Sequence, residues 1–372
     1  MIINWWEGVF YCFCLVTIIQ VLYYVVFFTR LAFYQSKQKN VSQAFPVSVI
    51  ICARDEAANL TKNLPGALVQ KYGTAHEVIV VDDNSLDESK YILAAFQKTY
   101  QQLQIVELKQ EARFIPGKKW PLTIGIKTAK HEVVLLTDAD CIPVSEHWIQ
   151  KMQAGYQPHT EIVLGYGPHY KAGGLLNKLV RWETFHTALQ YLSYACAGLP
   201  YMGVGRNLSY KKELFFRHKG FSSHSNLASG DDDLFINTAA TRKNTAIVID
   251  KEAFTFTDPP KTWSQWRKQK TRHYSTGKSY KVTHKFLLAL YAFTHFAFYP
   301  LLISCLLFYQ WKTVMLIFFL RFILQSFVFY RTMSKLDEKD LFAWFLFFDI
   351  WMFFYYLIFS STMLKKPARS WN

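Results

Sequence analysis

The stretch EVVLLTDADCIP, residues 132–143, decides the fold prediction. An apolar run leads into two acids one residue apart, Asp138 and Asp140, and a turn with Pro143 follows. A strand buried on both faces has such a continuous apolar run, and ligands of open α/β sheets bind beyond the carboxyl ends of the strands. The stretch therefore predicts a buried strand, and its acids form either a solvated strand end or half of a metal site.

Three shorter runs with strand character precede it, at residues 47–53, 77–83 and 104–108. Between the first two, apolar residues recur at helical spacing over residues 56–71, and a kink is expected at Pro65. Strands that alternate with helices favour an α/β domain with a mostly parallel sheet.

Polar residues gather where three of these strands end, as ARDE (residues 53–56), DDNS (82–85) and DAD (138–140). A dinucleotide-binding domain of similar topology requires G-x-G-x-x-G directly after its first strand. The turn here, ARDEAANL (53–60), contains no glycine, which excludes that kind of site.

Apolar segments long enough to cross a bilayer lie at both ends of the chain. The first covers residues 8–28 without a charge, and three more cover residues 286–309, 314–330 and 341–364. Cations that follow the first segment predict that its C-terminal end is cytoplasmic. We expect an N-terminal transmembrane anchor (1–36), a cytoplasmic α/β domain (46–260), an amphipathic segment at the membrane interface (261–285), C-terminal transmembrane helices (286–364) and a basic tail (365–372).

This arrangement contains a conflict of topology. Three complete C-terminal crossings would carry the tail, with Lys365, Lys366 and Arg369, to the outer side. Either one segment does not cross or the positive-inside rule fails here. Within the apolar segments, Arg321 and Asp349 lie near the midpoints, so a mutual ion pair or a polar acceptor channel is expected.

The net charge of +15 raises nucleic acid as a partner. Much of the basic excess lies in residues 261–285 beside a membrane segment, where anionic lipid attracts cations, so a membrane partner is favoured over nucleic acid. The six cysteines form no CxxC pair, which argues against a zinc site and a disulfide framework.

Seven motifs together resemble the membrane-bound inverting family-2 glycosyltransferases, which have a GT-A fold and include ceramide glucosyltransferases and polysaccharide synthases. The motifs are VSVIICARDEAANL (47–60), EVIVVDDNSLDES (77–89), PGKKWPLTIGI (116–126), VVLLTDADCIP (133–143), GVGRNLSYKKELF (203–215), SGDDDLFIN (229–237) and WSQWRKQKTRH (263–273). The resemblance implies a GT-A domain flanked by transmembrane helices.

For the donor, the resemblance implies a nucleotide-sugar, in the first place a UDP-sugar. Asp140 is expected to hold Mg²⁺ or Mn²⁺, because oxygen ligands with room for phosphate suit these ions. The expected donor-binding residues are Ala53, Glu56, Asp82, Asp83, Lys118, Lys119 and Asp138. For the two lysines a solvated loop is the equal alternative.

For catalysis, the resemblance implies that Asp232 takes the proton of the acceptor hydroxyl, with Asp231 beside it. A charged helix N-terminus would also explain these acids. Gln269 and Arg272 match a family motif that closes the active site at the membrane surface, whereas His273 stands where processive synthases have a tryptophan.

The expected function is inverting transfer of a sugar to a membrane-associated lipid or lipid-linked glycan, in the cell envelope of a bacterium, with the domain on the cytoplasmic face of the inner membrane. The alternatives are a processive polysaccharide synthase and an inactive sugar-nucleotide-binding membrane scaffold. The motifs specify neither the sugar nor the acceptor.

Overall fold

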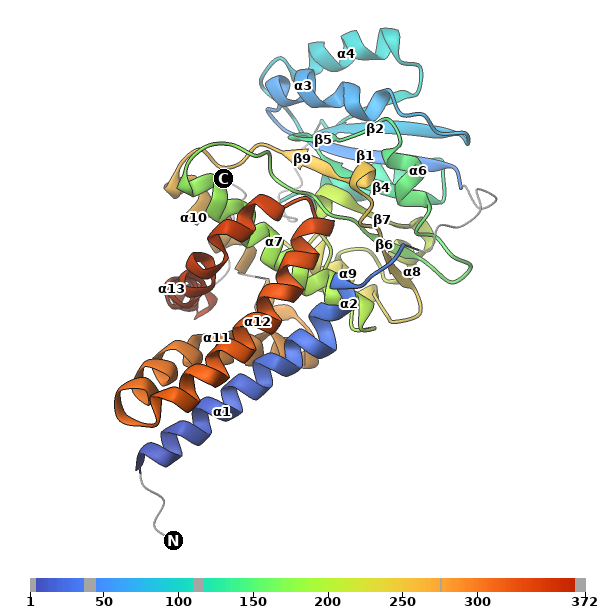
Figure 1. Ribbon diagram of the computed structural model, residues 1–372. Coiled ribbons are helices and arrows are strands. Elements are labelled where there is room, and N and C mark those ends of the chain that lie inside the picture. The colour runs from blue at the N-terminus through green and yellow to red at the C-terminus, as the bar shows by residue number, and fades with distance from the viewer. Residues whose placement is uncertain (1–4, 37–44, 110–116, 275, 365–372) are drawn as a thin grey trace.

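The computed structural model describes residues 5–36, 45–109, 117–274 and 276–364. They form an α/β domain from which a bundle of long helices extends (Figure 1). The described strands all belong to the α/β domain, and the helices predicted to cross the membrane come from the two ends of the chain.

The main sheet has seven strands in the order β3-β2-β1-β4-β7-β6-β8. Strands β1 to β4 are mutually parallel, whereas β7 runs antiparallel to both its neighbours, and β6 pairs with β8 in parallel. The bounds are β1 Val47–Ala53, β2 His76–Asp82, β3 Leu103–Glu107, β4 Val133–Asp138, β6 Ile162–Leu164, β7 Leu208–Lys211 and β8 Thr245–Ile247. The prediction of a mostly parallel sheet is confirmed.

The chain turns within the DAD motif, and Pro143 lies in the short strand that follows. Strand β4 ends at Asp138, and the chain turns through Ala139 and Asp140 into β5 (Cys141–Pro143). Strand β5 pairs with β9 (Thr255–Thr257) in a separate two-stranded sheet. The turn frees the two acids from the alternation of an extended strand.

Helices cover both faces of the main sheet because successive strand side chains point to opposite sides. Ile50 packs with helices α5 and α7, whereas its neighbours Val49 and Ile51 pack with α3, α4 and α6. The bounds are α3 Ala57–Leu68, α4 Ser89–Thr99, α5 Lys119–Thr128, α6 Trp148–Gln153, α7 Leu175–Cys196, α8 Lys212–Arg217, α9 Asp233–Ala239 and α10 Trp263–Tyr274.

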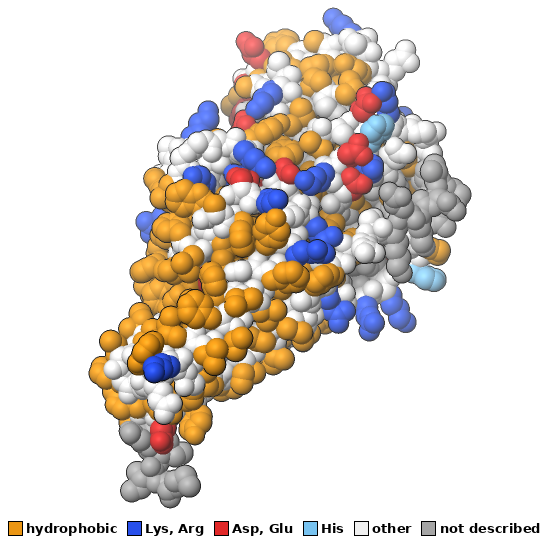
Figure 2. Space-filling model, in the orientation of Figure 1, with side chains coloured by type: hydrophobic (Ala, Val, Ile, Leu, Met, Phe, Trp, Pro, Cys, Tyr) orange, Lys and Arg blue, Asp and Glu red, His pale blue; other side chains and the backbone are white. Residues whose placement is uncertain are grey.

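Four stretches of described helix are long and apolar enough to cross a membrane: residues 5–32, 282–308, 311–335 and 339–359. They contain α1 (Trp5–Tyr23), the π-helical turn η1 (Tyr24–Phe28), α2 (Thr29–Ala32), α11 (Val282–Phe308), α12 (Trp311–Lys335), η7 (Lys339–Trp344) and α13 (Phe345–Leu364). Helices α1, α11 and α12 lie side by side (Figure 1), and hydrophobic side chains cover this part of the face in Figure 2.

Helix α13 takes a different course from the other three. Near its start, Phe348 stacks on Trp182 of α7 with ring centroids 4.9 Å apart. Near its end, Phe359 lies against Trp266 of α10, with centroids 5.5 Å apart. Helix α13 therefore packs against α7 of the α/β domain near its start and beside α10 near its end (Figure 1).

A buried polar cluster lies inside the helical bundle. The guanidinium of Arg321 pairs with Asp349 at 3.3 Å, which confirms the predicted mutual pair. Asp349 also accepts a hydrogen bond from Gln325 and lies 3.0 Å from His295 Nε2. Since each charge is paired and hydrogen-bonded, the cluster meets the condition for burying ions.

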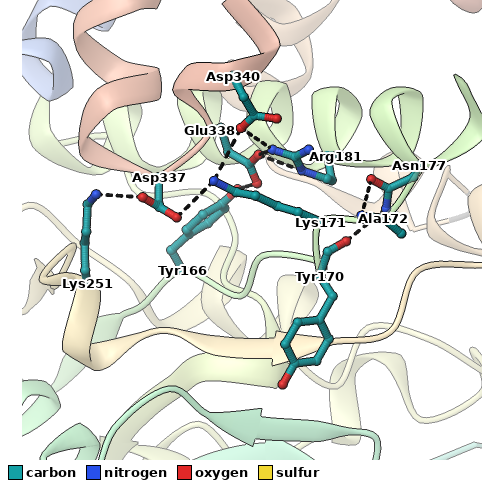
Figure 3. A network of polar contacts seen from close by, with 10 residues as sticks. All are labelled: Tyr166, Tyr170, Lys171, Ala172, Asn177, Arg181, Lys251, Asp337, Glu338 and Asp340. Atoms are coloured by element: carbon teal, nitrogen blue, oxygen red, sulfur yellow. Dashed lines mark hydrogen bonds and ion pairs between the residues drawn. The ribbon is translucent and has the colours of Figure 1, made fainter. Parts of the chain in front are cut away.

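A second network ties the α/β domain to the chain between α12 and α13 (Figure 3). Arg181 of α7 is buried and donates to Glu338 and Asp340. Lys171 and Lys251 of the α/β domain both pair with Asp337. The domain is thus held to this segment by charged contacts as well as by aromatic packing.

Candidate functional site

A cavity of about 1090 Å³ opens at the carboxyl ends of β1 and β4 and extends toward α11 and α13. Seven of the predicted site residues line it: Glu56, Lys118, Asp138, Asp140, Asp231, Asp232 and Arg272. Ala53, Asp82, Asp83, Lys119 and Gln269 do not belong to the lining. The fold therefore joins acids from three distant parts of the sequence in one cavity.

Asp138 is paired with Lys118 across the cavity wall. Burial opposes ionisation of Asp138, but the charge and hydrogen bond of Lys118, with help from Arg206 and Arg272, hold the pKa of this carboxyl below its usual value. Asp138 is thus an anion with a cation beside it. The alternative of a solvated loop does not hold for Lys118, which is buried.

Asp138, Asp140 and Cys141 each offer one possible metal-ligand atom, and these atoms lie within 4.8 Å of one another. Burial, and then the charge of Asp140, raises the pKa of the Cys141 thiol well above its usual value, so the thiol keeps its proton and is a poor ligand. The two carboxylates are the hard oxygen donors that Mg²⁺ and Mn²⁺ take. These residues fit a divalent cation.

The loops after β1 and β2 bind each other at the edge of the cavity. The backbone N–H of Asp83 donates to the Ala53 carbonyl at 2.8 Å, and Asp82 accepts from the Ser85 N–H at 3.1 Å. Asp55 and Asn84 have positive φ values of 54° and 55°, which non-glycine residues adopt rarely. Ala53, Asp82 and Asp83 thus lie beside the cavity, in a loop pair with an unusual backbone.

Lys119 occupies a place that neither sequence interpretation foresees. Its ammonium is buried and donates to three backbone carbonyls, those of His224, Leu227 and Ser229, each at 2.7 Å. These carbonyls belong to the loop that leads directly into Asp231. Lys119 therefore holds that loop, and it is neither solvated nor exposed to the cavity.

The three acids at the start of α9 have different surroundings. Asp233 is buried and accepts hydrogen bonds from the hydroxyls of Thr276 (2.5 Å) and Tyr280 (2.7 Å). It thereby fixes α9 to the segment that follows α10. Its role is accounted for by these contacts.

Asp232 caps helix α9. One carboxylate oxygen accepts from the Asp233 N–H at 2.7 Å, and the other accepts from the Gly205 N–H at 2.8 Å. Burial, and then the charges of Asp231 and Asp233, raises the pKa of Asp232 to about 8. Among the described residues, no hydrogen bond reaches the carboxylate of Asp231, which lines the cavity. The second reading of this run, a helix N-terminus, thus applies to Asp232.

Helix α10 brings further charge to the cavity. Arg272 lines it, as does Lys270, which is buried and paired with Glu183 of α7. Gln269 is partly exposed and lies outside the lining. His273 also lines the cavity, and its side chain is exposed there.

Arg206 is a cavity residue that the sequence analysis does not single out. It lies in the 3₁₀ turn η3 (Gly205–Asn207), and its Nη1 is 3.3 Å from His169 Nε2. A basic residue within the GVGRNL motif was the available signal. Without the fold, nothing distinguished it from the many other cations of this chain.

The cavity has two chemically distinct parts. Around Asp138, Asp140 and Asp231 the lining is charged, whereas between α11 and α13 it is mostly apolar. We call this second part the apolar limb and define it by Leu288, Ala289, Ala292, Phe293, Phe296, Met352, Tyr355, Tyr356, Leu357 and Phe359. A single cavity thus connects a polar centre to the helical bundle.

Comparison with known proteins identifies the domain. Residues 48–221 match the family described as Glycosyl transferase family 2. This chain carries a glycosyltransferase family 2 domain. The match covers β1 to β7 and the DAD turn, so the predicted resemblance is confirmed for the α/β domain.

Two curated relatives are similar to parts of this chain. Beta-monoglucosyldiacylglycerol synthase of Nostoc sp. is 30% identical over 111 residues, which are 29% of this chain and 23% of the relative. Probable glycosyltransferase YdaM of Bacillus subtilis is 26% identical over 270 residues, 67% of this chain and 59% of the relative. The chain thus spans about a quarter and three fifths of these relatives' lengths.

Among solved structures, mannosyltransferase PcManGT from Pyrobaculum calidifontis, in complex with GDP-Man and Mn²⁺, shares the fold. The TM-score is 0.59, and the match covers 93% of this chain and 99% of that chain at 16% identity. The expected GT-A fold is confirmed, and the coverage extends the likeness beyond the family 2 domain.

Proposed function

We propose that this protein transfers a sugar from a nucleotide-sugar to an acceptor held in the membrane, with inversion at the anomeric carbon. One observation carries the proposal: the cavity that contains Asp138, Asp140 and Asp231 continues into a limb between helices apolar enough to cross a bilayer. The names of the relatives agree with it, since one is a synthase of a glycolipid and a structural neighbour is bound to GDP-Man.

In this proposal the charged part of the cavity binds the nucleotide diphosphate. Asp140, with Asp138, would hold Mg²⁺ or Mn²⁺, which when bound neutralises charge on the leaving diphosphate. Lys118 and Arg272 line the same part of the cavity. Their positively charged side chains can donate hydrogen bonds to phosphate oxygens. The pocket for the nucleobase of the donor is expected beside the loops that contain Ala53, Asp82 and Asp83.

The acceptor hydroxyl needs a base, and the hydrogen bonds favour Asp231 over the expected Asp232. Both oxygens of Asp232 accept from backbone N–H groups. Asp231 lines the cavity and is free of such contacts among the described residues. We therefore assign the base to Asp231 and the cap to Asp232.

Direct displacement by the activated hydroxyl requires no enzyme nucleophile and inverts the anomeric centre. The stereochemistry of the product, measured by NMR, tests this point directly. A product that retains the donor's anomeric configuration would contradict a single displacement.

The principal test is an assay of the purified full-length protein in detergent. UDP-, GDP- and CMP-sugars are screened with Mg²⁺ or Mn²⁺ for release of the nucleotide, and a membrane lipid extract is then added as acceptor. We expect metal-dependent release with at least one donor and transfer to lipid. Absence of turnover, with a donor that nevertheless binds, would instead favour the inactive scaffold.

Two isosteric variants test the base. Asp231→Asn should lower transfer by at least 100-fold, since general base catalysis contributes about 10²–10⁴-fold, and should leave donor binding nearly unchanged. Asp232→Asn is the comparison variant: its one amide oxygen can keep the helix cap, whereas one of the two bonds from the N–H groups of Asp233 and Gly205 is lost, so a much smaller loss of transfer is expected. If Asp232→Asn lowered transfer more than Asp231→Asn did, the general base would be Asp232.

A processive synthase is less well supported. The limb that leaves the polar centre is lined by Phe293, Phe296 and Met352 rather than by a continuous row of polar side chains. A growing glycan could not replace its hydrogen bonds to water there. Products that contain one added sugar per acceptor are therefore expected on chromatography.

A further inference from the structure

We propose that the acceptor is a membrane lipid with a hydroxyl-bearing head group, whose hydrocarbon chain lies in the apolar limb between α11 and α13. This inference rests on the proposed function and adds the acceptor's class and its route of entry. The lipid would enter sideways from the bilayer, with its head group reaching the polar centre.

The residues of α11 that line the limb lie on one face of this helix. Ala289, Ala292, Phe293 and Phe296 follow one another at helical spacing, so they share one face of the helix. The two alanines leave room, and the phenylalanines supply apolar surface. Across the limb, Met352 and Tyr356 of α13 line the other side.

The position of the limb identifies its occupant. Helix α11 is one of the helices long and apolar enough to cross the membrane, and the Phe293 side of it is open, with 65% of that residue exposed. The medium at such a helix is hydrocarbon. A polar glycan or a free nucleotide would lose its hydrogen bonds there, whereas an alkyl chain loses nothing.

The head group would meet α7 on its way to the base. Thr187 and Gln190 line the same cavity as the limb, and Glu183, paired with Lys270, follows one turn nearer the start of α7. These side chains can donate to and accept from hydroxyl groups. The cavity therefore changes from apolar to polar along its length, as an amphipathic lipid does.

Narrowing the limb tests the proposal without touching the charged centre. Ala289→Trp and Ala292→Trp should lower transfer to a membrane lipid extract at least tenfold and leave metal-dependent donor hydrolysis within twofold of the unmodified protein. Ile303→Trp is the matched control, because Ile303 lies on the same helix, is 56% exposed and does not line the cavity. Unchanged lipid transfer in both alanine variants would overturn the proposal.

A second measurement needs no variant. Alkyl glucosides with chains of 4 to 12 carbons are offered as acceptors below their critical micelle concentrations. Burial of the chain predicts that kcat/KM rises roughly three- to fourfold per methylene until the limb is filled. Equal use of all chain lengths would refute the limb as a chain site. The two proposals fail in distinguishable ways. If the proposed function is wrong, the unmodified protein hydrolyses no nucleotide-sugar. If only the chain site is wrong, hydrolysis persists but does not depend on the acceptor's chain length.

Discussion

At the scale of single residues, the adjacent lysines at the start of α5 show how one turn of chain serves two sides of the site. Lys118 pairs with Asp138 on the side of the predicted donor. Lys119 points instead to the loop before Asp231 and donates to three of its carbonyls. The position of α5 therefore fixes the donor acid and the candidate base relative to each other.

Replacement of these lysines should separate the two roles. Lys119→Met removes a charged donor from three backbone carbonyls, so we expect a loss of roughly 1–3 kcal/mol in stability and a lower kcat. Lys118→Met should chiefly raise the KM for the donor. Thermal unfolding and steady-state kinetics of both variants check this; a stable Lys119→Met protein with normal kcat would contradict the role of Lys119.

The sequence indicated the acids of the site but not which of them would be hydrogen-bonded and which would face the cavity. DAD and DDD were visible as acidic runs at the end of a strand and the start of a helix. Which of Asp231, Asp232 and Asp233 remains free depends on Gly205, Thr276 and Tyr280. The nearest of these contacts in sequence is 27 residues away, so no local pattern could reveal it.

At the scale of elements, helix α5 lies close to the sheet because Gly125 faces it. A Cβ atom at this position would lie 2.7 Å from Ile50 Cγ2 and 3.1 Å from Val81 Cγ2. Both distances are shorter than van der Waals contact. The glycine thus permits the close approach that places Lys118 and Lys119.

Gly125→Ala should push α5 away from the sheet. Overpacking lowers the free energy of unfolding by about 1–3 kcal/mol, and the higher helix propensity of alanine offsets about 1 kcal/mol of this. A net loss of about 1 kcal/mol in stability is therefore expected. Donor binding should weaken with it. Gly73→Ala, where no atom lies within 4 Å of the added Cβ, is the control for the same substitution in open space. Equal melting temperatures for the two would contradict this account.

The strands of the sheet were easier to predict from the sequence than helix α7. Strands β1, β2 and β4 are mostly apolar, and the predicted positions of β1 to β4 lie within two residues of those observed. Helix α7 has no apolar face to recognise, because polar and apolar side chains alike are buried. Its Arg181 and His186 are satisfied by Glu338 and Tyr291, which lie 157 and 105 residues away.

At the scale of the whole molecule, the α/β domain and the helical bundle are joined through buried charge. Arg181 and Glu338 have almost no exposed surface. Removal of one partner leaves the other charge buried, which costs about 3–5 kcal/mol. Arg181→Met should therefore lower the melting temperature by roughly 10 °C, and the double variant with Glu338→Gln should recover part of it. Calorimetry in detergent checks both; no recovery would mean that packing dominates.

The course of α13 bears on the topology conflict of the sequence. One end contacts α7 of the α/β domain and the other contacts α10 of the segment predicted to lie at the membrane interface, so α13 need not cross the bilayer. With α1, α11 and α12 as crossings, the basic residues 365–372, which lie outside the described residues, would be on the side of the α/β domain. That placement satisfies the positive-inside rule without exception.

Accessibility in sealed vesicles tests this topology. An epitope tag after Asn372 and a second one beside Gly73 should be digested by protease from the same side. Opposite sides for the two tags would mean that α13 crosses after all. A tag before Trp5 should be protected when the other two are cleaved, since one crossing separates it from the domain.

The apolar limb also has a kinetic consequence. If the limb is filled from the bilayer along α11, as proposed, the protein samples the lipid in two dimensions, and the relevant acceptor concentration is a mole fraction in the membrane rather than an amount per volume of solution. Diluting the acceptor with inert lipid would slow the protein, whereas adding more vesicles of the same composition would not.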